Sequence, residues 1–235
     1  MATPPVPQDL DTFDLLDTEH LRLERFFATL DASGWERPTA CAGWRRREMI
    51  AHLAGGETYN LACLRDSLNE LMASAVAASV ENVDSFNAWQ VRLRQDRPVA
   101  EVLHEWRVAA AVVRRELRQR GRDGTLPTMV GPYGAEPQAF HLAFEAAIHG
   151  DDMDIPVLEE ERAGRRAWMA RFCIFALAEE ARPVEAELDR GRVRVRHTQT
   201  NEVAELDDAD LVAVFSGRAP RRLPESLDGA LRMYT

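Results

Sequence analysis

Three side chains of the types that bind divalent metals stand out in the sequence: His52, Glu145 and His149. Glu145 and His149 are four residues apart, so on a helix both leave one face about one turn apart and can converge on one ion. A glutamate and a histidine at the spacing of Glu145 and His149 are more often a surface ion pair. A lone inward histidine such as His52 is more often a hydrogen-bonded core residue. Helical bundles, however, build metal sites from inward carboxylates and histidines on facing helices, and three protein ligands leave a coordination position open. The combination predicts one divalent metal held by these three side chains.

Other side chains are candidates for contacts with a substrate or cosubstrate. His20 and His141 lie on helical stripes that can face the site, as a fourth ligand, a base or a substrate contact, although core packing is the commoner role. Arg92 and Arg94 are candidates for binding an anionic group. Tyr133 lies in a long glycine- and proline-rich segment, residues 121–137, which we expect to be a loop that can close over a substrate.

Four long helices are expected to position these residues. Apolar residues recur at steps of three and four in each of four segments, the pattern of a helix with one buried face. The segments are residues 10–30, 44–71, 99–119 and 138–149. A shorter helix is expected over residues 84–95. The segments predict a four-helix bundle, and the Gly55-Gly56 pair inside the second helix indicates close approach of a ligand or backbone there.

The pattern of apolar residues changes after Pro183, from helical periodicity to short alternating runs. A helix is expected over residues 164–181, followed by three short strands at 184–188, 193–197 and 203–206, and by a helix that Asp207 caps. We therefore expect a mainly α protein with two parts. Residues 1–182 form the helical bundle, and residues 183–235 form a small α/β module.

Composition excludes several classes of function. The formal net charge of −10, without a sufficient basic patch, argues against nucleic acid as a partner. All 29 basic residues are arginines, so lysine Schiff bases and a phosphate-loop lysine are excluded. The 3 cysteines are widely spaced, no leader-like segment opens the chain, and no run of about eighteen apolar residues occurs. We expect a cytoplasmic protein, without membrane association, as a monomer or homodimer.

Two motifs resemble those of a known family, the DinB-like metal-binding bundle proteins of the group that contains mycothiol-dependent maleylpyruvate isomerases and mycothiol S-transferases. The first runs from Trp35 to Trp44, with Pro38, Thr39, Cys41 and Gly43, and continues through Glu48 to residues 51–57, AHLAGGE. The second is residues 145–152, EAAIHGDD. Residues 86–87, the helix of Trp106 and residues 210–218 are also similar, so the resemblance covers most of the chain. One departure is Arg45, where a small hydroxyl residue is usual, so the usual N-cap hydrogen bond should be missing.

The resemblance implies that His52, Glu145 and His149 are metal ligands, normally of zinc, with water completing the site. Asp152 matches the acidic position that follows, and three residues after His149 it can hold that imidazole in one tautomer, which we state as a hypothesis. Cys41 matches an ordinary position of the family's loop, and we expect a structural role. The arginine-rich composition agrees with an actinobacterial source that makes mycothiol.

The resemblance further implies an enzyme that uses mycothiol as cosubstrate. Zinc with an open position lowers the pKa of a thiol, and the thiolate attacks an electrophilic small molecule. Release of the thiol gives cis-trans isomerisation, and retention gives S-transfer. Two alternatives stay open: a non-haem iron enzyme with the same two-histidine, one-carboxylate ligands, and a non-catalytic protein that binds a small molecule for resistance.

Overall fold

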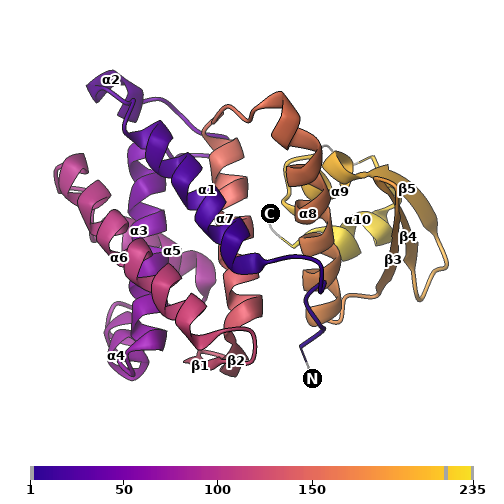
Figure 1. The fold of residues 1–235 in the computed structure, drawn as a ribbon, viewed down its shortest axis with the longest axis horizontal. Coiled ribbons are helices and arrows are strands. Elements are labelled where there is room, and N and C mark those ends of the chain that lie inside the picture. The colour runs from indigo at the N-terminus through magenta and orange to yellow at the C-terminus, as the bar shows by residue number, and fades with distance from the viewer. Residues whose placement is uncertain (1–2, 220–221, 234–235) are drawn as a thin grey trace. The chain divides into compact units, whose positions relative to one another are not determined.

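The structure, a computed structural model, describes residues 3–219 and 222–233. Two compact units are present (Figure 1): one of residues 11–155, and one of residues 156–235 with 1–10, as far as these are described. In the part of the chain that the structure describes, the helices lack the combination of length and apolar character needed to span a bilayer.

The larger unit is built on four long helices, as the sequence predicts. These are α1 (Thr12–Phe27), α3 (Arg46–Leu64), α6 (Val99–Arg120) and α7 (Ala135–Asp152). Helix α1 packs along α7 and α3 packs along α6, while α6 also contacts α1 and α7. The four-helix bundle is therefore confirmed, and its core lies between these helices.

Helix α1 shows how the local sequence starts and orients a helix. The Asp11 side chain accepts hydrogen bonds from the backbone N–H groups of Phe13 and Asp14, which the first turn would otherwise leave unpaired. The stripe of Leu16, His20, Leu23 and Phe27 is buried. Burial of this stripe directs His20 into the bundle.

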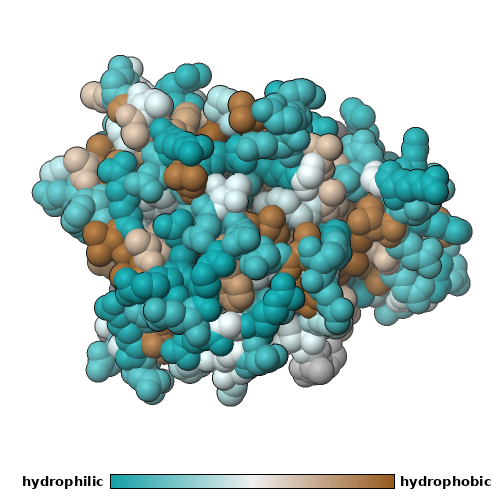
Figure 2. Space-filling model, viewed as in Figure 1, coloured by the Kyte–Doolittle hydropathy of each residue, from teal (hydrophilic) through white to brown (hydrophobic). Residues whose placement is uncertain are grey.

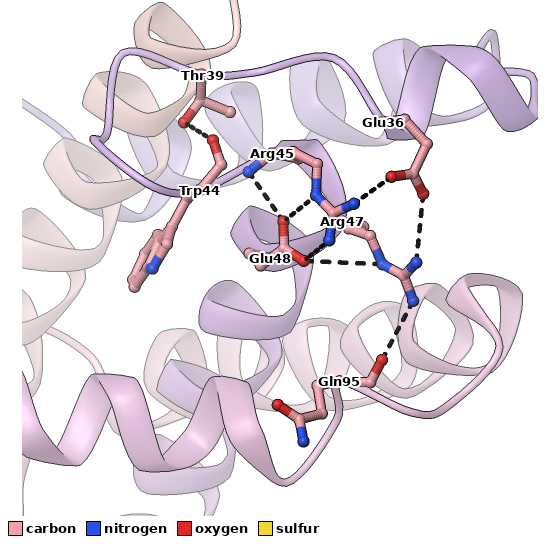
Figure 3. Close-up of polar contacts among 7 residues, drawn as sticks. All are labelled: Glu36, Thr39, Trp44, Arg45, Arg47, Glu48 and Gln95. Carbon is pink, nitrogen blue, oxygen red and sulfur yellow. Dashed lines mark hydrogen bonds and ion pairs between the residues drawn. The ribbon is translucent and has the colours of Figure 1, made fainter.

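The start of α3 lacks a side-chain N-cap bond, as expected from Arg45. Instead, the Glu48 carboxylate accepts the backbone N–H of Arg45 at 2.9 Å and also binds its guanidinium (Figure 3). Glu36 bridges Arg45 and Arg47, so the two arginines and two acids form one ionic cluster. The Thr39 hydroxyl donates to the Trp44 carbonyl at 2.9 Å and fixes the loop that leads into the helix.

Helix α3 is buried on nearly all sides, with every residue from Met49 to Gly55 inaccessible or almost so. The glycine pair accounts for part of this packing. A Cβ at Gly55 would lie 2.5 Å from the Gln90 Cβ on α5 (Val83–Arg92), so only glycine allows this approach. A Cβ at Gly56 would lie 3.7 Å from Glu145 Oε1. The close approach at Gly55 is thus to the Gln90 side chain, and not to the ligand or backbone that the sequence led us to expect.

Three features of this unit differ from the sequence prediction. The helix expected over 44–71 ends at Leu64, and the chain turns through Asp66, at φ 57°, into α4 (Leu68–Ala77). A short α2 (Ala32–Trp35) precedes α3. The segment expected as a loop forms a hairpin, β1 (Thr125–Thr128) with β2 (Gly131–Gly134), and then the start of α7. Prolines in both strands, which are unusual in paired strands, obscure the hairpin in the sequence.

The smaller unit holds α8 (Glu159–Glu179), an antiparallel sheet and two short helices. The sheet order is β3 (Val184–Asp189), β4 (Arg192–His197) and β5 (Val203–Asp207), close to the predicted strands. Asp207 caps α9 (Asp208–Phe215) as predicted, by accepting the Asp210 N–H, and α10 (Glu225–Leu231) follows. Because α8 packs on α9 and β3, it groups with this unit, whereas the sequence-based boundary after residue 182 assigns it to the bundle.

The surface is mainly hydrophilic on the face shown in Figure 2, with hydrophobic side chains scattered over it. Single exposed apolar residues of this kind, such as Val76 and Val130, are ordinary on a folded protein.

Candidate metal centre

His52, Glu145 and His149 meet between α3 and α7, as the sequence predicts. His52 Nε2 lies 3.1 Å from His149 Nε2 and 3.3 Å from Glu145 Oε1. One ligand atom from each residue falls within 4.8 Å of the other two. The His52 side chain is 6% exposed and that of Glu145 is 35% exposed, so the cluster is closed on the His52 side and accessible at Glu145.

The surrounding helices fix the orientation of these groups. Glu145 and His149 are one turn apart on α7, and the edge of one imidazole faces the other ring, with centroids 4.8 Å apart at 85°. Trp44, from the loop before α3, packs on His52 at 5.1 Å. The aromatic neighbour and the helix together hold His52 toward His149.

The electrostatics suit a cation. Burial raises the pKa of Glu145, but the hydrogen bond from His52 and the nearby histidines outweigh it and hold that pKa below its ordinary value. Burial lowers the pKa of His149, which favours a neutral imidazole. An ionised carboxylate and neutral imidazoles are the forms that bind metals. Two imidazole nitrogens 3.1 Å apart repel each other if both present lone pairs, unless a cation or a shared proton lies between them.

Asp152 lies directly behind His149. Its Oδ2 is 2.9 Å from His149 Nδ1, which places the imidazole proton on Nδ1 and leaves Nε2 free to coordinate. The Cys41 thiol donates to the same oxygen at 3.2 Å, and Ala40 N–H donates to the Asp152 carbonyl. Asp152 is therefore anchored to the loop before α3. Cys41, His149 and Asp152 form a second group with metal-ligand spacing, which shares His149 with the first.

The other candidates divide between the site and the rest of the bundle. His20 is buried near the cluster, with Nε2 3.6 Å from Glu57 Oε1. Tyr133 and His141 lie together, with ring centroids 6.1 Å apart.

The two arginine candidates are not in the cluster. Arg94 is buried in a hydrogen-bonded network with Gln90, Thr58 and Glu105. Arg92 is exposed at the end of α5. We find no contact between either arginine and the three ligand side chains among the described residues.

Glu57 is the member of this region that sequence reasoning did not single out. It follows the glycine pair on α3 and is buried with His20, which stacks on Trp106 of α6 at 5.4 Å. Glu57 is five residues after His52, so a single-stripe analysis places the two on different faces. The available signal was a charged residue that directly follows a helical segment, residues 53–56, of apolar residues and glycine.

Comparison with known proteins supports the resemblance. The model of the mycothiol maleylpyruvate isomerase N-terminal domain matches residues 16–154. The crystal structure of a mycothiol-dependent maleylpyruvate isomerase matches with a TM-score of 0.58 and 14% identity over 95% of each chain. A point mutant of a mycothiol-dependent maleylpyruvate isomerase matches with a TM-score of 0.57 and 14% identity over 93% of each chain. No curated protein matches the chain. At this identity, the two structures establish a shared fold.

Proposed function

Because the chain belongs to the family of the mycothiol maleylpyruvate isomerase N-terminal domain, we propose that it is a metal-dependent enzyme that adds mycothiol to an electrophilic small molecule. The metal is a divalent cation of the zinc type. Residues 16–154, which match the family, include all the residues of the candidate metal centre.

The observation that supports the proposal most directly is the convergence of His52, Glu145 and His149. Their donor atoms, two imidazole nitrogens and one carboxylate oxygen, are the set that binds catalytic zinc, and the separations of 3.1 and 3.3 Å fit ligands that share one ion. Three protein ligands leave a position for a thiol. The exposure of Glu145 lies on the side from which a thiol can enter.

Each residue has a role that follows from its contacts. A bound zinc ion supplies positive charge that lowers the pKa of a thiol and so provides thiolate near neutral pH. Asp152 holds the His149 ring in the tautomer with Nε2 free. Trp44 packs on His52 and keeps water from that side of the site. These residues orient the ligands and shield them.

Isomerisation and S-transfer share the same first step, in which the thiol sulfur forms a bond to carbon of the electrophile. Loss of the thiol after rotation about the former double bond gives the isomer, and retention of the sulfur gives the conjugate. We propose mycothiol as cosubstrate in both cases. Maleylpyruvate is the first electrophile to test, because it is the substrate in the name of the family.

The test is a thiol-dependent assay of zinc-loaded protein. Purified wild-type protein should isomerise maleylpyruvate, or consume mycothiol with maleylpyruvate or monochlorobimane, and His52→Ala should abolish the reaction. His104→Ala, a change at an exposed histidine of α6, is the matched control and should behave as wild type. Oxygen consumption by iron-loaded protein without any thiol dependence would contradict the proposal.

A further inference from the structure

A second pair of ionisable side chains lies in the same bundle core. His20 of α1 and Glu57 of α3 face each other with His20 Nε2 3.6 Å from Glu57 Oε1, and their side chains are 6% and 5% exposed. Trp106 of α6 stacks on the His20 ring at an interplanar angle of 11°. The pair is thus held in a fixed arrangement inside the bundle.

The pair is not fully satisfied by its surroundings. Glu57 Oε2 and His20 Nδ1 are buried and have no hydrogen-bond partner among the described residues. Leaving such atoms unpaired costs free energy that apolar side chains of similar size would not cost. A role in stability therefore does not explain these residues, and the buried carboxyl group of Glu57 keeps a hydrogen-bonding position that no described residue fills.

The pair adjoins the candidate metal centre on the Glu145 side. Glu57 follows Gly56, whose Cβ position would lie 3.7 Å from Glu145 Oε1. The charge of Glu145 raises the pKa values of both Glu57 and His20, whereas Arg114 of α6 lowers both. The charged and titratable groups that face Glu57 are thus His20 on α1, Arg114 on α6 and Glu145 on α7.

The burial of the pair favours the uncharged form of each side chain. Burial, with the charge of Glu145 in addition, raises the pKa of Glu57 to about 8. Burial also lowers the pKa of His20 to about 3, so His20 is neutral.

We propose that Glu57, positioned by His20, is the acid of this active site and donates its proton to the electrophile as the thiol sulfur adds. The proposal rests on the function proposed above and names its substrate class, α,β-unsaturated carbonyl compounds. A sulfur lone pair forms the C–S bond, the π electrons of the double bond move toward the carbonyl oxygen, and that oxygen takes the proton of Glu57. Glu57 becomes a carboxylate. In isomerisation, elimination of the thiolate returns the proton to Glu57, and in S-transfer Glu57 is reprotonated from water.

The first experiment detects the proton without any turnover. Infrared spectra of the zinc-loaded wild-type protein at neutral pH should contain the carbonyl band of a buried protonated carboxyl group, and this band should weaken as pH rises. Glu57→Gln should remove the band, while Glu101→Gln, at an exposed position of α6, should retain it. Absence of the band from the wild-type protein would overturn the proposal. This outcome does not depend on whether any variant folds.

The second experiment measures the reaction of mycothiol with maleylpyruvate. Glu57→Gln should lower kcat by about 100-fold or more, with zinc content and mycothiol affinity unchanged. Glutamine keeps the shape of the protonated glutamate side chain but cannot donate its proton as an acid. Glu57→Asp should recover part of the rate, and the wild-type fall in kcat at high pH should be lost in Glu57→Gln. Normal wild-type activity with an unchanged kcat in Glu57→Gln would overturn the acid role alone. Zinc-loaded wild-type protein that uses no mycothiol would overturn the proposed function and the acid role together.

Discussion

Replacement of Glu57 by glutamine should change the pH dependence of folding stability. The Glu57 side chain is 5% exposed, and its pKa is about 8 in the folded protein against an ordinary value of 4.5. The folded state therefore binds a proton that the unfolded state releases. Stability from this group is complete below about pH 4.5 and is lost as pH rises through about 8.

The magnitude follows from these two pKa values. Between about pH 5 and about pH 7.5, Glu57 should lower the free energy of unfolding of the metal-free protein by about 3 kcal/mol. Glutamine has no proton to lose. The difference in stability, Glu57→Gln minus wild type, should therefore rise by about 3 kcal/mol over this range, whatever its value at pH 5.

Urea denaturation of both proteins, in chelator and at a series of pH values, measures this difference. Comparison of the two proteins at each pH cancels groups that titrate alike in both, and an m value that stays constant confirms that the same transition is followed. A stability difference that does not change with pH would refute the reasoning, because it would mean that Glu57 is ionised in the folded protein.

Three further predictions concern other contacts. Asp152→Asn should weaken zinc affinity by about 10- to 100-fold in a competitive chelator titration, because it loosens the hold on the metal-binding imidazole, whereas the exposed Asp151→Asn should have little effect. Glu48→Ala should destabilise the protein by about 1 kcal/mol in urea denaturation through loss of the bond at the start of α3, and an unchanged midpoint would contradict that role. Leu117→Ala, at a fully buried position of α6, should cost about 2–5 kcal/mol by calorimetry and denaturation, against a small change for Val108→Ala at an exposed position.

The sequence was sufficient to predict the bundle because helices such as α1 have one buried stripe. In α1, Leu16, His20, Leu23 and Phe27 recur at steps of three and four, and all are buried. The same logic placed Glu145 and His149 on one face of α7, where the structure brings them to His52. Local periodicity and one-turn spacing are enough to predict the helices and the shared face of these two side chains.

The remaining features depend on contacts that local patterns do not encode. Helix α3 is buried on nearly all sides, so no stripe distinguishes its inward residues and Glu57 could not be assigned to the region of His52. The end of α3 at Leu64 and the hairpin of residues 125–134 depend on packing with other elements, and the prolines there argued against strands. Arg94 binds Gln90 and Thr58 within the bundle, a set of contacts that its position in the sequence does not indicate, and the role of Arg92 and Arg94 in binding an anionic group stays a prediction.

The most direct test of the central claim is the zinc content of purified protein, measured by plasma mass spectrometry after reconstitution and removal of free metal. Wild type and the His104→Ala control should each contain about one zinc ion per chain, and His52→Ala, Glu145→Ala and His149→Ala should contain almost none while remaining folded by circular dichroism. Equal zinc in the wild type and in all three ligand variants, or none in the wild type after reconstitution with zinc, iron or manganese, would contradict the account.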